Sequence, residues 1–351
     1  MKLIYTIALL LISLTVSSQT YSGPESAEFD VANNRWLIAN TSSHQVLARD
    51  SVGTLSIFVS GLGSGPYGIE IVGDTLFCCS GASIKGYSLT TAAQVFNLNL
   101  GASFLNGLAH DDSGNLYATD FSAKTIYKVN IAAQTDSIIA SGLVQSPNGI
   151  IFDQPNNRCV FVNWGSNAPI KAINLSTYAV STIISTTLSN CDGVARDGQG
   201  RYFVSNWGAQ SVVRYDSDFV APPTTVGTGL SSPADIFYDV THDILAVPNS
   251  GNNTVTFLDF NTTGIDEQSN DAMSVAYPNP ASSFLTIEIA DENIGTLLIY
   301  NSTGQLVHEQ SYVQYGNEIY VNVSNLDFGN YFYSITITGG KRIVGRFQVA
   351  K

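Results

Sequence analysis

Short apolar runs alternate with polar turns through the first 260 residues of the chain. Each run follows a turn rich in Asp, Asn and Gly, residues that hydrogen-bond the turn or tolerate positive φ. Five of these runs are 36–39, 116–118, 159–162, 202–204 and 244–247. Apolar runs this short, bounded by turn residues, are typical of β-strands. The pattern therefore predicts an all-β chain.

A short phrase recurs ahead of each of these units. Its middle residue occupies positions 25, 67, 106, 148, 192 and 234, so the repeat is about 42 residues long. A fixed period in this range is typical of solenoids, propellers and arrays. With four short strands in each unit, the sequence predicts a six-bladed β-propeller over residues 19–262. The ring must close to be stable, because one blade cannot bury both its faces alone.

Polar residues at two fixed places in the repeat have structural interpretations. An Asp stands five positions after the middle residue in five of the six repeats, and we expect these side chains to cap turns. They are Asp30, Asp111, Asp153, Asp197 and Asp239. A polar residue also ends the second strand of each unit, and we expect it to bond loop backbone. These residues include Asn40, Asp120, Asn163, Asn206 and Asn249.

The sixth unit has no evident fourth strand. It runs from its third apolar stretch directly into Asn261-Thr262-Thr263-Gly264. Two ways of closing the ring remain open: residues 19–22 complete the last blade, or residues 262–268 fold back onto it.

The pattern changes after a polar linker at residues 263–274. Six alternating strands then predict a small antiparallel β-sandwich over residues 275–351. The expected strands are 284–289, 296–300, 305–308, 319–323, 331–337 and 342–349. Asn301-Ser302-Thr303-Gly304 and Gly339-Gly340 read as hairpin turns between them.

Ordered motifs in this second module carry a resemblance to a known family. They are Tyr277-Pro278-Asn279-Pro280, the stretch from Leu298 to Val307, the stretch from Leu326 to Phe332, and the basic end from Lys341 to Lys351. The module resembles the type A C-terminal sorting domain of the type IX (Por) secretion system. The resemblance implies that an outer-membrane translocon handles the chain, which is then released or attached to the cell surface.

The N-terminus has the pattern of a targeting segment. Lys2 precedes a mostly apolar run at residues 3–16, which is too short for an ordinary membrane span. Small residues at Val16-Ser17-Ser18 then offer a cleavage site. We therefore expect a signal peptide at residues 1–18, an exported protein, and no transmembrane segment.

Composition narrows the choice of partners. The chain carries 28 acidic and 15 basic residues, a net charge of −13. Nucleic acid and anionic membranes are therefore excluded as expected partners, and a cation or a neutral ligand is favoured. The four cysteines, Cys78, Cys79, Cys159 and Cys191, match no zinc pattern. They are either buried free thiols on inner strands or include a Cys159–Cys191 disulfide between neighbouring blades.

The variable middle residue of the phrase is the strongest candidate for chemistry. It stands where each blade's innermost strand begins, so six unlike side chains are expected to ring one mouth of the channel. The ring consists of Glu25, Tyr67, Asn106, Asn148, Asp192 and Ala234. Carboxylate and carboxamide oxygens are hard ligands suited to Ca²⁺ or Mg²⁺. Tyr67 is expected to form a wall of the pocket.

The phrases around this ring resemble those of the gluconolactonase and senescence-marker-protein (regucalcin) family. Glu25 in the first repeat, Asn148 in Asn148-Gly149 and Asp192 in Asp192-Gly193 match that family's divalent-metal ligands. Asn106 in Asn106-Gly107 matches an Asn that contacts substrate. The resemblance implies a lactone or ester hydrolase with Ca²⁺ as the favoured ion and Asp192 as the base that takes a proton from water.

Two other interpretations remain open. Asn-Gly and Asp-Gly at this position also occur in NHL-like propellers, and residues 101–105 contain no counterpart of the family's substrate-contacting Arg. The alternative function is a non-catalytic propeller that binds a small molecule, glycan or protein. Trp164 and Trp207, in twin Asn-Trp-Gly phrases, would then flank the same pocket. A purely structural propeller is the third interpretation.

Overall fold

The computed structural model describes residues 19–260, 274–289, 293–315, 318–337 and 342–350. The predicted signal peptide at residues 1–18 and all but the last residue of the predicted linker 263–274 lie outside the described residues. The chain divides into two compact units, Met1–Phe260 and Asn261–Lys351, and each is described by itself.

Six antiparallel sheets build the first unit. Sheet 1 contains β1 (Pro24–Asp30), β2 (Arg35–Asn40), β3 (Gln45–Arg49) and β4 (Leu55–Ser60). Sheet 2 contains β5 (Ile69–Val72), β6 (Thr75–Ser80), β7 (Ser83–Ser88) and β8 (Gln94–Asn99). Sheet 3 contains β9 (Leu105–His110), β10 (Asn115–Asp120), β11 (Thr125–Asn130) and β12 (Thr135–Ala140).

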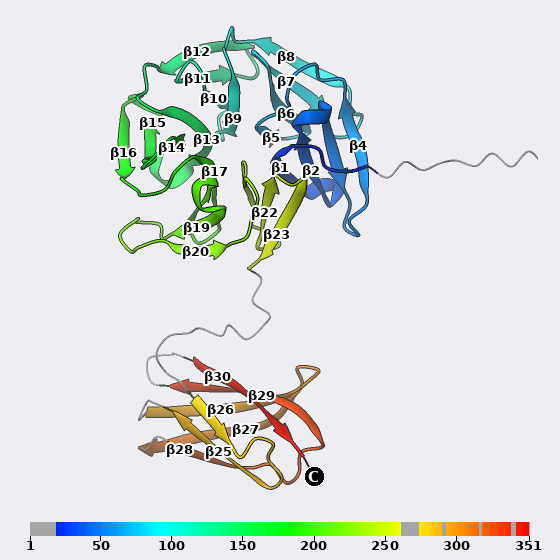
Figure 1. Cartoon of the computed structure of the whole chain (residues 1–351), viewed down its shortest axis with the longest axis vertical. Coiled ribbons are helices and arrows are strands. Elements are labelled where there is room, and N and C mark those ends of the chain that lie inside the picture. Colours follow the sequence, from blue (N-terminus) through cyan, green and yellow to red (C-terminus); the bar gives the residue numbers. More distant parts are fainter. Residues whose placement is uncertain (1–18, 261–273, 290–292, 316–317, 338–341, 351) are drawn as a thin grey trace, which may run out of the picture. The chain divides into compact units, whose positions relative to one another are not determined.

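The other three sheets repeat this order. Sheet 4 contains β13 (Ser146–Asp153), β14 (Arg158–Trp164), β15 (Ile170–Asn174) and β16 (Val180–Ile184). Sheet 5 contains β17 (Cys191–Arg196), β18 (Tyr202–Asn206), β19 (Ser211–Tyr215) and β20 (Thr224–Gly227). Sheet 6 contains β21 (Phe237–Asp239), β22 (Ile244–Asn249) and β23 (Thr254–Asp259). Figure 1 shows the first strands of the sheets around the middle of the unit and the fourth strands at its rim.

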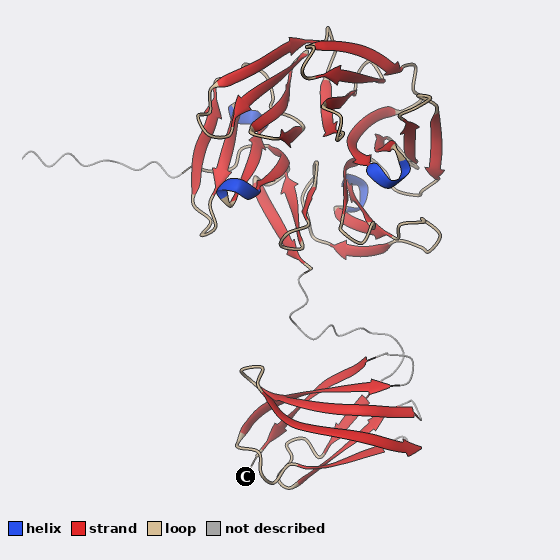
Figure 2. Cartoon of the chain, turned by 180° about the vertical axis from the view of Figure 1, so that it is seen from behind, coloured by secondary structure: helices blue, strands red, loops and turns tan. Residues whose placement is uncertain are grey.

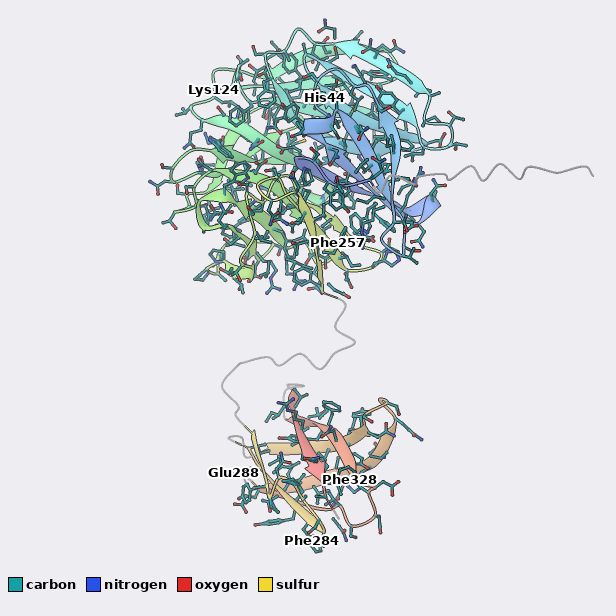
Figure 3. All side chains as sticks on the ribbon, turned by 45° about the vertical axis from the view of Figure 1, so that its right-hand side comes forward. His44, Lys124, Phe257, Phe284, Glu288 and Phe328 are labelled. Carbon is teal, nitrogen blue, oxygen red and sulfur yellow. The ribbon has the colours of Figure 1, made fainter. Side chains whose placement is uncertain are left out.

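Hydrophobic cores join each sheet to the next and close the ring. Separate clusters lie between sheets 1 and 2, 2 and 3, 3 and 4, 4 and 5, and 5 and 6. A further cluster packs Phe29 and Trp36 of sheet 1 against Ala246 and Phe257 of sheet 6. Phe257, labelled in Figure 3, also lies 4.6 Å from the Arg49 guanidinium, which stands over its ring. Both faces of every sheet are therefore covered, as a β-propeller requires.

The sixth sheet has three strands among the described residues. Residues 19–22 form no strand, so the expectation that they complete this sheet is wrong. They bond sheet 1 instead, because the Ser22 backbone N–H donates to Asn40 Oδ1 at 2.9 Å. The alternative segment, residues 262–268, lies outside the described residues.

Most polar residues of the repeat have the predicted structural roles, and Asp153 is an exception because its side chain does not cap the turn backbone. Backbone N–H groups of the following turn donate to the carboxylates of Asp30, Asp111, Asp197 and Asp239. Asp153 differs, since its carboxylate accepts side-chain bonds from Asn156 and Arg158. The residues that end the second strands bond loop backbone, at Asn40, Asp120, Asn163, Asn206 and Asn249. The helices within the described residues are short 3₁₀ turns of three residues each, drawn in blue in Figure 2. They are Val31–Asn33, Thr41–Ser43, Gln154–Asn156 and Trp207–Ala209.

All four cysteines are buried and free. The alternative of a Cys159–Cys191 disulfide is therefore wrong. Cys159 and Cys191 belong to different hydrophobic cores, between sheets 3 and 4 and between sheets 4 and 5. Cys78 and Cys79 also point to opposite faces of β6, into separate cores.

Two further sheets build the second unit. One contains β24 (Ser274–Tyr277), β25 (Phe284–Ile289) and β28 (Glu318–Asn322). The other contains β26 (Asn293–Asn301), β27 (Leu306–Tyr315), β29 (Gly329–Ile337) and β30 (Arg342–Val349). Residues of both sheets share one core, with Leu285 and Val321 from the first sheet and Leu297 and Phe347 from the second. No helix within the described residues is long and apolar enough to cross a membrane.

Candidate functional site: one mouth of the channel

The structure places the six phrase residues, here called the mouth ring, at the start of the inner strands. Four of them lie within the first three residues of a strand: Glu25 in β1, Asn106 in β9, Asn148 in β13 and Asp192 in β17. Tyr67 lies just before β5, and Ala234 lies just before β21. Hydroxyl groups of second strands fix the backbone there. Thr119 Oγ1 and Ser205 Oγ each donate at 2.7 Å, to the carbonyls of Asn148 and Ala234 respectively. The backbone is thus held without the ring side chains, which leaves those side chains available for ligands.

A layer of glycines lies directly behind the mouth ring: Gly68, Gly107, Gly149 and Gly193. A Cβ on Gly107 would lie 2.4 Å from the Asn148 carbonyl oxygen, so only glycine allows the inner strands to approach this closely. The matching positions in sheets 1 and 6 hold Ser26 and Asp235 instead. The Ser26 hydroxyl donates to Asp235 Oδ2 at 3.0 Å across the layer.

Three oxygens of the mouth ring are buried and accept no hydrogen bond within the described residues: Asn106 Oδ1, Asn148 Oδ1 and Asp192 Oδ1. The residues that carry them are 5%, 1% and 3% exposed. The amide of Asn148 is oriented by its Nδ2, which donates to the Cys191 carbonyl at 3.4 Å. An unpaired buried acceptor costs about 1–3 kcal/mol. A cation or a donor-rich ligand at this mouth would offset that cost.

Burial and neighbouring negative charges disfavour the ionised forms of the two mouth carboxyls. Burial raises the pKa of Glu25 to about 7. Burial, and then the neighbouring carboxyls Glu25 and Asp235, raise the pKa of Asp192 well above its usual value. The Trp207 indole and the Asn148 amide beside Asp192 lower that pKa by less. Each carboxyl therefore stands where a positive charge would be stabilised.

Five partly exposed aromatic rings form an arc whose two ends lie near the mouth carboxyls Glu25 and Asp192. Successive ring centroids are 4.6, 5.7, 6.0 and 5.1 Å apart, all in edge-to-face contact. The aromatic arc runs through Tyr67, Phe104, Phe121, Trp164 and Trp207. At one end the charge of Glu25, after burial, contributes to a raised Tyr67 pKa, and at the other end Trp207 lies beside Asp192. The arc therefore forms one wall of the mouth.

The donor set fits a hard cation only in part. Within the described residues, no three acidic, His or Cys side chains are placed to share one metal ion. The mouth ring contains two carboxylates, and its other side-chain oxygens are the carboxamides of Asn106 and Asn148 and the phenol of Tyr67. Ca²⁺ accepts such mixed oxygen ligands, so the unpaired oxygens of Asn148 and Asp192 are compatible with it.

Sequence reasoning missed a second ionisable group, on the far side of the glycine layer. A cavity of about 290 Å³ is lined by residues of all six sheets, and none of its described lining residues belongs to the mouth ring. Glu28, Glu70 and Asp235 line this turn-side cavity, together with His110 and Arg196. Asp235 had a detectable signal in the sequence, since it replaces the glycine found at that position in four repeats.

The second unit has a clear relationship to a known family. Residues 275–349 match the secretion system C-terminal sorting domain, over the strands β24 to β30. The C-terminal unit is a sorting domain. This sorting domain directs the chain through the type IX secretion system, to the cell surface or into the medium. The prediction that the type IX secretion machinery handles this chain is therefore confirmed.

The first unit resembles solved propellers in fold. Regucalcin from Agrobacterium tumefaciens, titled a calcium-binding protein, is 16% identical with a TM-score of 0.56 over 69% of this chain and 91% of its own. An auxiliary nutrient binding protein from Bacteroides thetaiotaomicron is 12% identical with a TM-score of 0.56 over 68% and 70%. A chain of a nidogen/laminin complex is 16% identical with a TM-score of 0.57 over 64% and 89%. Comparison with curated proteins gives no match. At these identities the likeness shows the propeller fold alone, so a sorting domain follows a β-propeller in this chain.

Proposed function

We propose that the mouth ring binds a divalent cation, Ca²⁺ first, through Glu25, Asn148 and Asp192. The observation that carries this proposal is the pair of buried oxygens, Asn148 Oδ1 and Asp192 Oδ1, that accept no hydrogen bond within the described residues. The raised pKa values of Glu25 and Asp192, each caused first by burial, support it because a bound cation would stabilise both charged forms. The regucalcin-like fold agrees with the same assignment.

We propose lactone or ester hydrolysis as the chemistry of this site. A divalent cation supplies polarisation of the substrate carbonyl and a lower pKa for water. Asp192 accepts the proton of the attacking water as the water oxygen bonds to the carbonyl carbon, and it then returns that proton to the oxygen that leaves when the ester C–O bond breaks. Asn106 presents its unpaired Oδ1 to a substrate hydroxyl, and Tyr67 closes the side of the pocket. The product is a hydroxy acid, or an acid and an alcohol.

The aromatic arc favours a second candidate function, a ligand-binding propeller without catalysis. Five partly exposed rings beside two carboxylates suit the apolar faces of a sugar or another small organic ligand. The fold is shared with auxiliary nutrient binding proteins, whose titles describe binding rather than catalysis. In either function we infer that each of the six sheets is one propeller blade and that the sorting domain is a β-sandwich.

Calcium titration of the full chain by calorimetry tests the cation site. We expect Asp192→Asn to weaken Ca²⁺ binding by on the order of 100-fold, because it removes a buried charged ligand while keeping the side-chain shape. Asp136→Asn, an exposed change on the outer strand β12, is the matched control and should leave affinity unchanged. Equal affinity in wild type and Asp192→Asn would overturn the assignment.

Turnover separates the two functions on the same samples. A panel of lactones and aryl esters is assayed with Ca²⁺ and with a chelator. Calcium-dependent hydrolysis that Asp192→Asn abolishes supports the hydrolase. Calcium binding without turnover, with sugars or aromatic ligands bound at the mouth, supports the binding propeller instead.

A further inference from the structure

The turn-side cavity combines hydrocarbon walls with a cluster of carboxyls. Its walls include Leu108, Ile150, Val194, Ile236 and Phe237. Glu28 from β1, Glu70 from β5 and Asp235 just before β21 lie in the same cavity. Their charges act on one another, because Glu70 and Asp235, after burial, both raise the pKa of Glu28. The cavity volume of about 290 Å³ is close to the lower end of the range for small-molecule sites.

Glu28 is the decisive side chain in this cluster. It is 6% exposed and lines the cavity, yet its carboxyl makes no hydrogen bond or ion pair with any described residue. Its two acidic neighbours have partners: Asp235 accepts from Ser26 at 3.0 Å, and Glu70 lies 2.5 Å from His110 Nδ1. A buried carboxyl without a partner is costly, whether ionised or protonated. Its position in a cavity leaves space for the group that would pair with it.

No cationic side chain among the described residues pairs with Glu28. The charged or titratable groups that line the cavity with Glu28 are Glu70, His110, Asp112, Arg196, Asp235 and Tyr238. The segment of β13 that lines the cavity, Ile150–Phe152, contributes only apolar side chains. Arg196 turns toward Asp153, with its Nε 3.9 Å from Asp153 Oδ1, and its guanidinium stands 5.7 Å from the Tyr202 ring. His110 is committed to Glu70.

We propose that the turn-side cavity binds a small organic ammonium ion, a primary amine with a short hydrocarbon body. An ammonium group donates three hydrogen bonds, which matches the three carboxyls Glu28, Glu70 and Asp235. The hydrocarbon body is buried against the apolar walls. A bare divalent metal fits less well, because the described residues place no three acidic, His or Cys side chains to share one ion and the other walls are hydrocarbon. The site is distinct from the mouth ring and does not depend on the function proposed there.

The rim of the cavity allows a ligand to enter. The His110 side chain is 36% exposed and Asp112, next to it on the rim, is also exposed. Asp112 is held in place by Gln154, whose Nε2 donates to its Oδ2 at 2.9 Å. An ammonium ion arriving from solvent meets the Asp112 carboxylate first and the buried carboxyls afterwards.

Calorimetric titration of the full chain with ethylamine, propylamine and butylamine tests the proposal, with butanol and butyrate as charge controls. We expect each added methylene to strengthen binding roughly four-fold until the cavity is full. Glu28→Gln should weaken butylamine at least about ten-fold, whereas Glu25→Gln, in the mouth ring, should change it less than about two-fold. Binding should also release protons and strengthen as pH rises, because burial raises the pKa of Glu28 and its carboxyl must ionise to pair with the amine.

The possible outcomes separate the proposal from its competitors. Butanol binding as tightly as butylamine would show an apolar cavity without charge recognition and would overturn the proposal. Calcium binding that Glu28→Gln abolishes would assign the cavity to an inorganic ion, and no binding of any amine would also refute it. If Glu28→Gln does not fold, Asp235→Asn carries the same test, since it removes a neighbouring charge from the same cluster.

Discussion

The two ends of the central channel use the same inner strands for opposite arrangements of polar groups. At the mouth ring, oxygens of Asn106, Asn148 and Asp192 are buried and left without donors among the described residues, and the Asn148 amide is held by the Cys191 carbonyl. At the turn-side cavity, three carboxyls crowd together among hydrocarbon walls. The glycine layer between them brings neighbouring backbones within contact. A few residues along one strand therefore separate a hard-oxygen site from an acidic, apolar one.

The difference shows that polar groups alone do not define the ligand. Carboxamide oxygens at the mouth can complete the coordination of a cation whose first ligands are carboxylates. The apolar walls of the turn-side cavity cannot coordinate a cation. The carboxyls of this cavity therefore favour a ligand that carries its own hydrocarbon surface. The aromatic arc adds a second asymmetry, since it borders the mouth ring from Tyr67 to Trp207.

The largest expected effect comes from breaking the layer that separates the two ends. A Cβ on Gly149 would lie 2.5 Å from the Asp192 carbonyl oxygen, 2.8 Å from Gly193 Cα and 3.1 Å from Asp235 Oδ1. Two of these atoms are backbone and cannot move aside cheaply. We expect Gly149→Ala to lower the free energy of unfolding by about 2–3 kcal/mol, measured by denaturant titration.

Gly198→Ala is the matched control for that substitution. A Cβ there would meet no atom within 4 Å, and its backbone is not in the left-handed region. Its stability should therefore stay within about 0.5 kcal/mol of wild type. Equal stability of both variants would mean that the inner strands do not depend on close backbone approach at Gly149.

A smaller effect should appear in the pH dependence of stability. Burial raises the pKa of Glu25 to about 7 and the pKa of Asp235 to about 8, from ordinary values of 4.5 and 3.8. Between the ordinary and the raised values the folded state binds more protons than the unfolded state. The free energy of unfolding should therefore fall as pH rises from about 4 to 8 and level off above that range.

The measurement is Tm across this pH range in a chelator-containing buffer. We expect a fall of about 5 °C or more from pH 5 to pH 8.5, given about 2–4 °C per kcal/mol for a domain of this size. Asp235→Asn should flatten the curve over the whole range up to about pH 8, whereas Glu25→Gln should flatten it only below about pH 7. A Tm that rises steadily to pH 8 would contradict the raised pKa values at both ends.

The sequence predicted the scaffold well because its signals are local. Turn residues, apolar runs and the phrase recur in each unit, so equivalent positions such as Asn148 and Asp192 could be aligned without a structure. Glu28 and Glu70 were missed, although they are the two acids at a position that holds Ala109, Ile151, Ala195 and Phe237 elsewhere. The variable middle residue of the phrase marks only the start of each inner strand, whereas Glu28 and Glu70 lie three residues further along their strands.

The aromatic arc could be predicted only in part. Trp164 and Trp207 stand in equivalent phrases, and sequence reasoning placed both near the mouth. Phe104 belongs to a loop before β9 and has no equivalent in the other repeats, so its contacts with Tyr67 and Phe121 depend on how the loop crosses between sheets. Contacts between sheets are long-range, and a repeat pattern carries no information about individual loops. The sequence did show that the sixth unit has no evident fourth strand, and its sheet has three strands among the described residues.

The smallest expected effect is a coupling between the two ends. The charge of Glu25, after burial, contributes to the raised pKa of Asp235, which lies within the glycine layer between the two sites. Saturating the mouth with Ca²⁺ should therefore weaken butylamine binding, by about two- to five-fold, because both ligands are positive and the carboxyls connect them. By reciprocity the amine should weaken Ca²⁺ by the same factor, which calorimetry in both orders of addition can measure. Glu25→Gln should reduce the coupling, whereas the exposed change Asp136→Asn should leave it intact. A weakening of butylamine that levels off at saturating Ca²⁺ would identify two sites in one channel. A weakening that keeps growing with Ca²⁺ concentration would mean that both ligands compete for a single site.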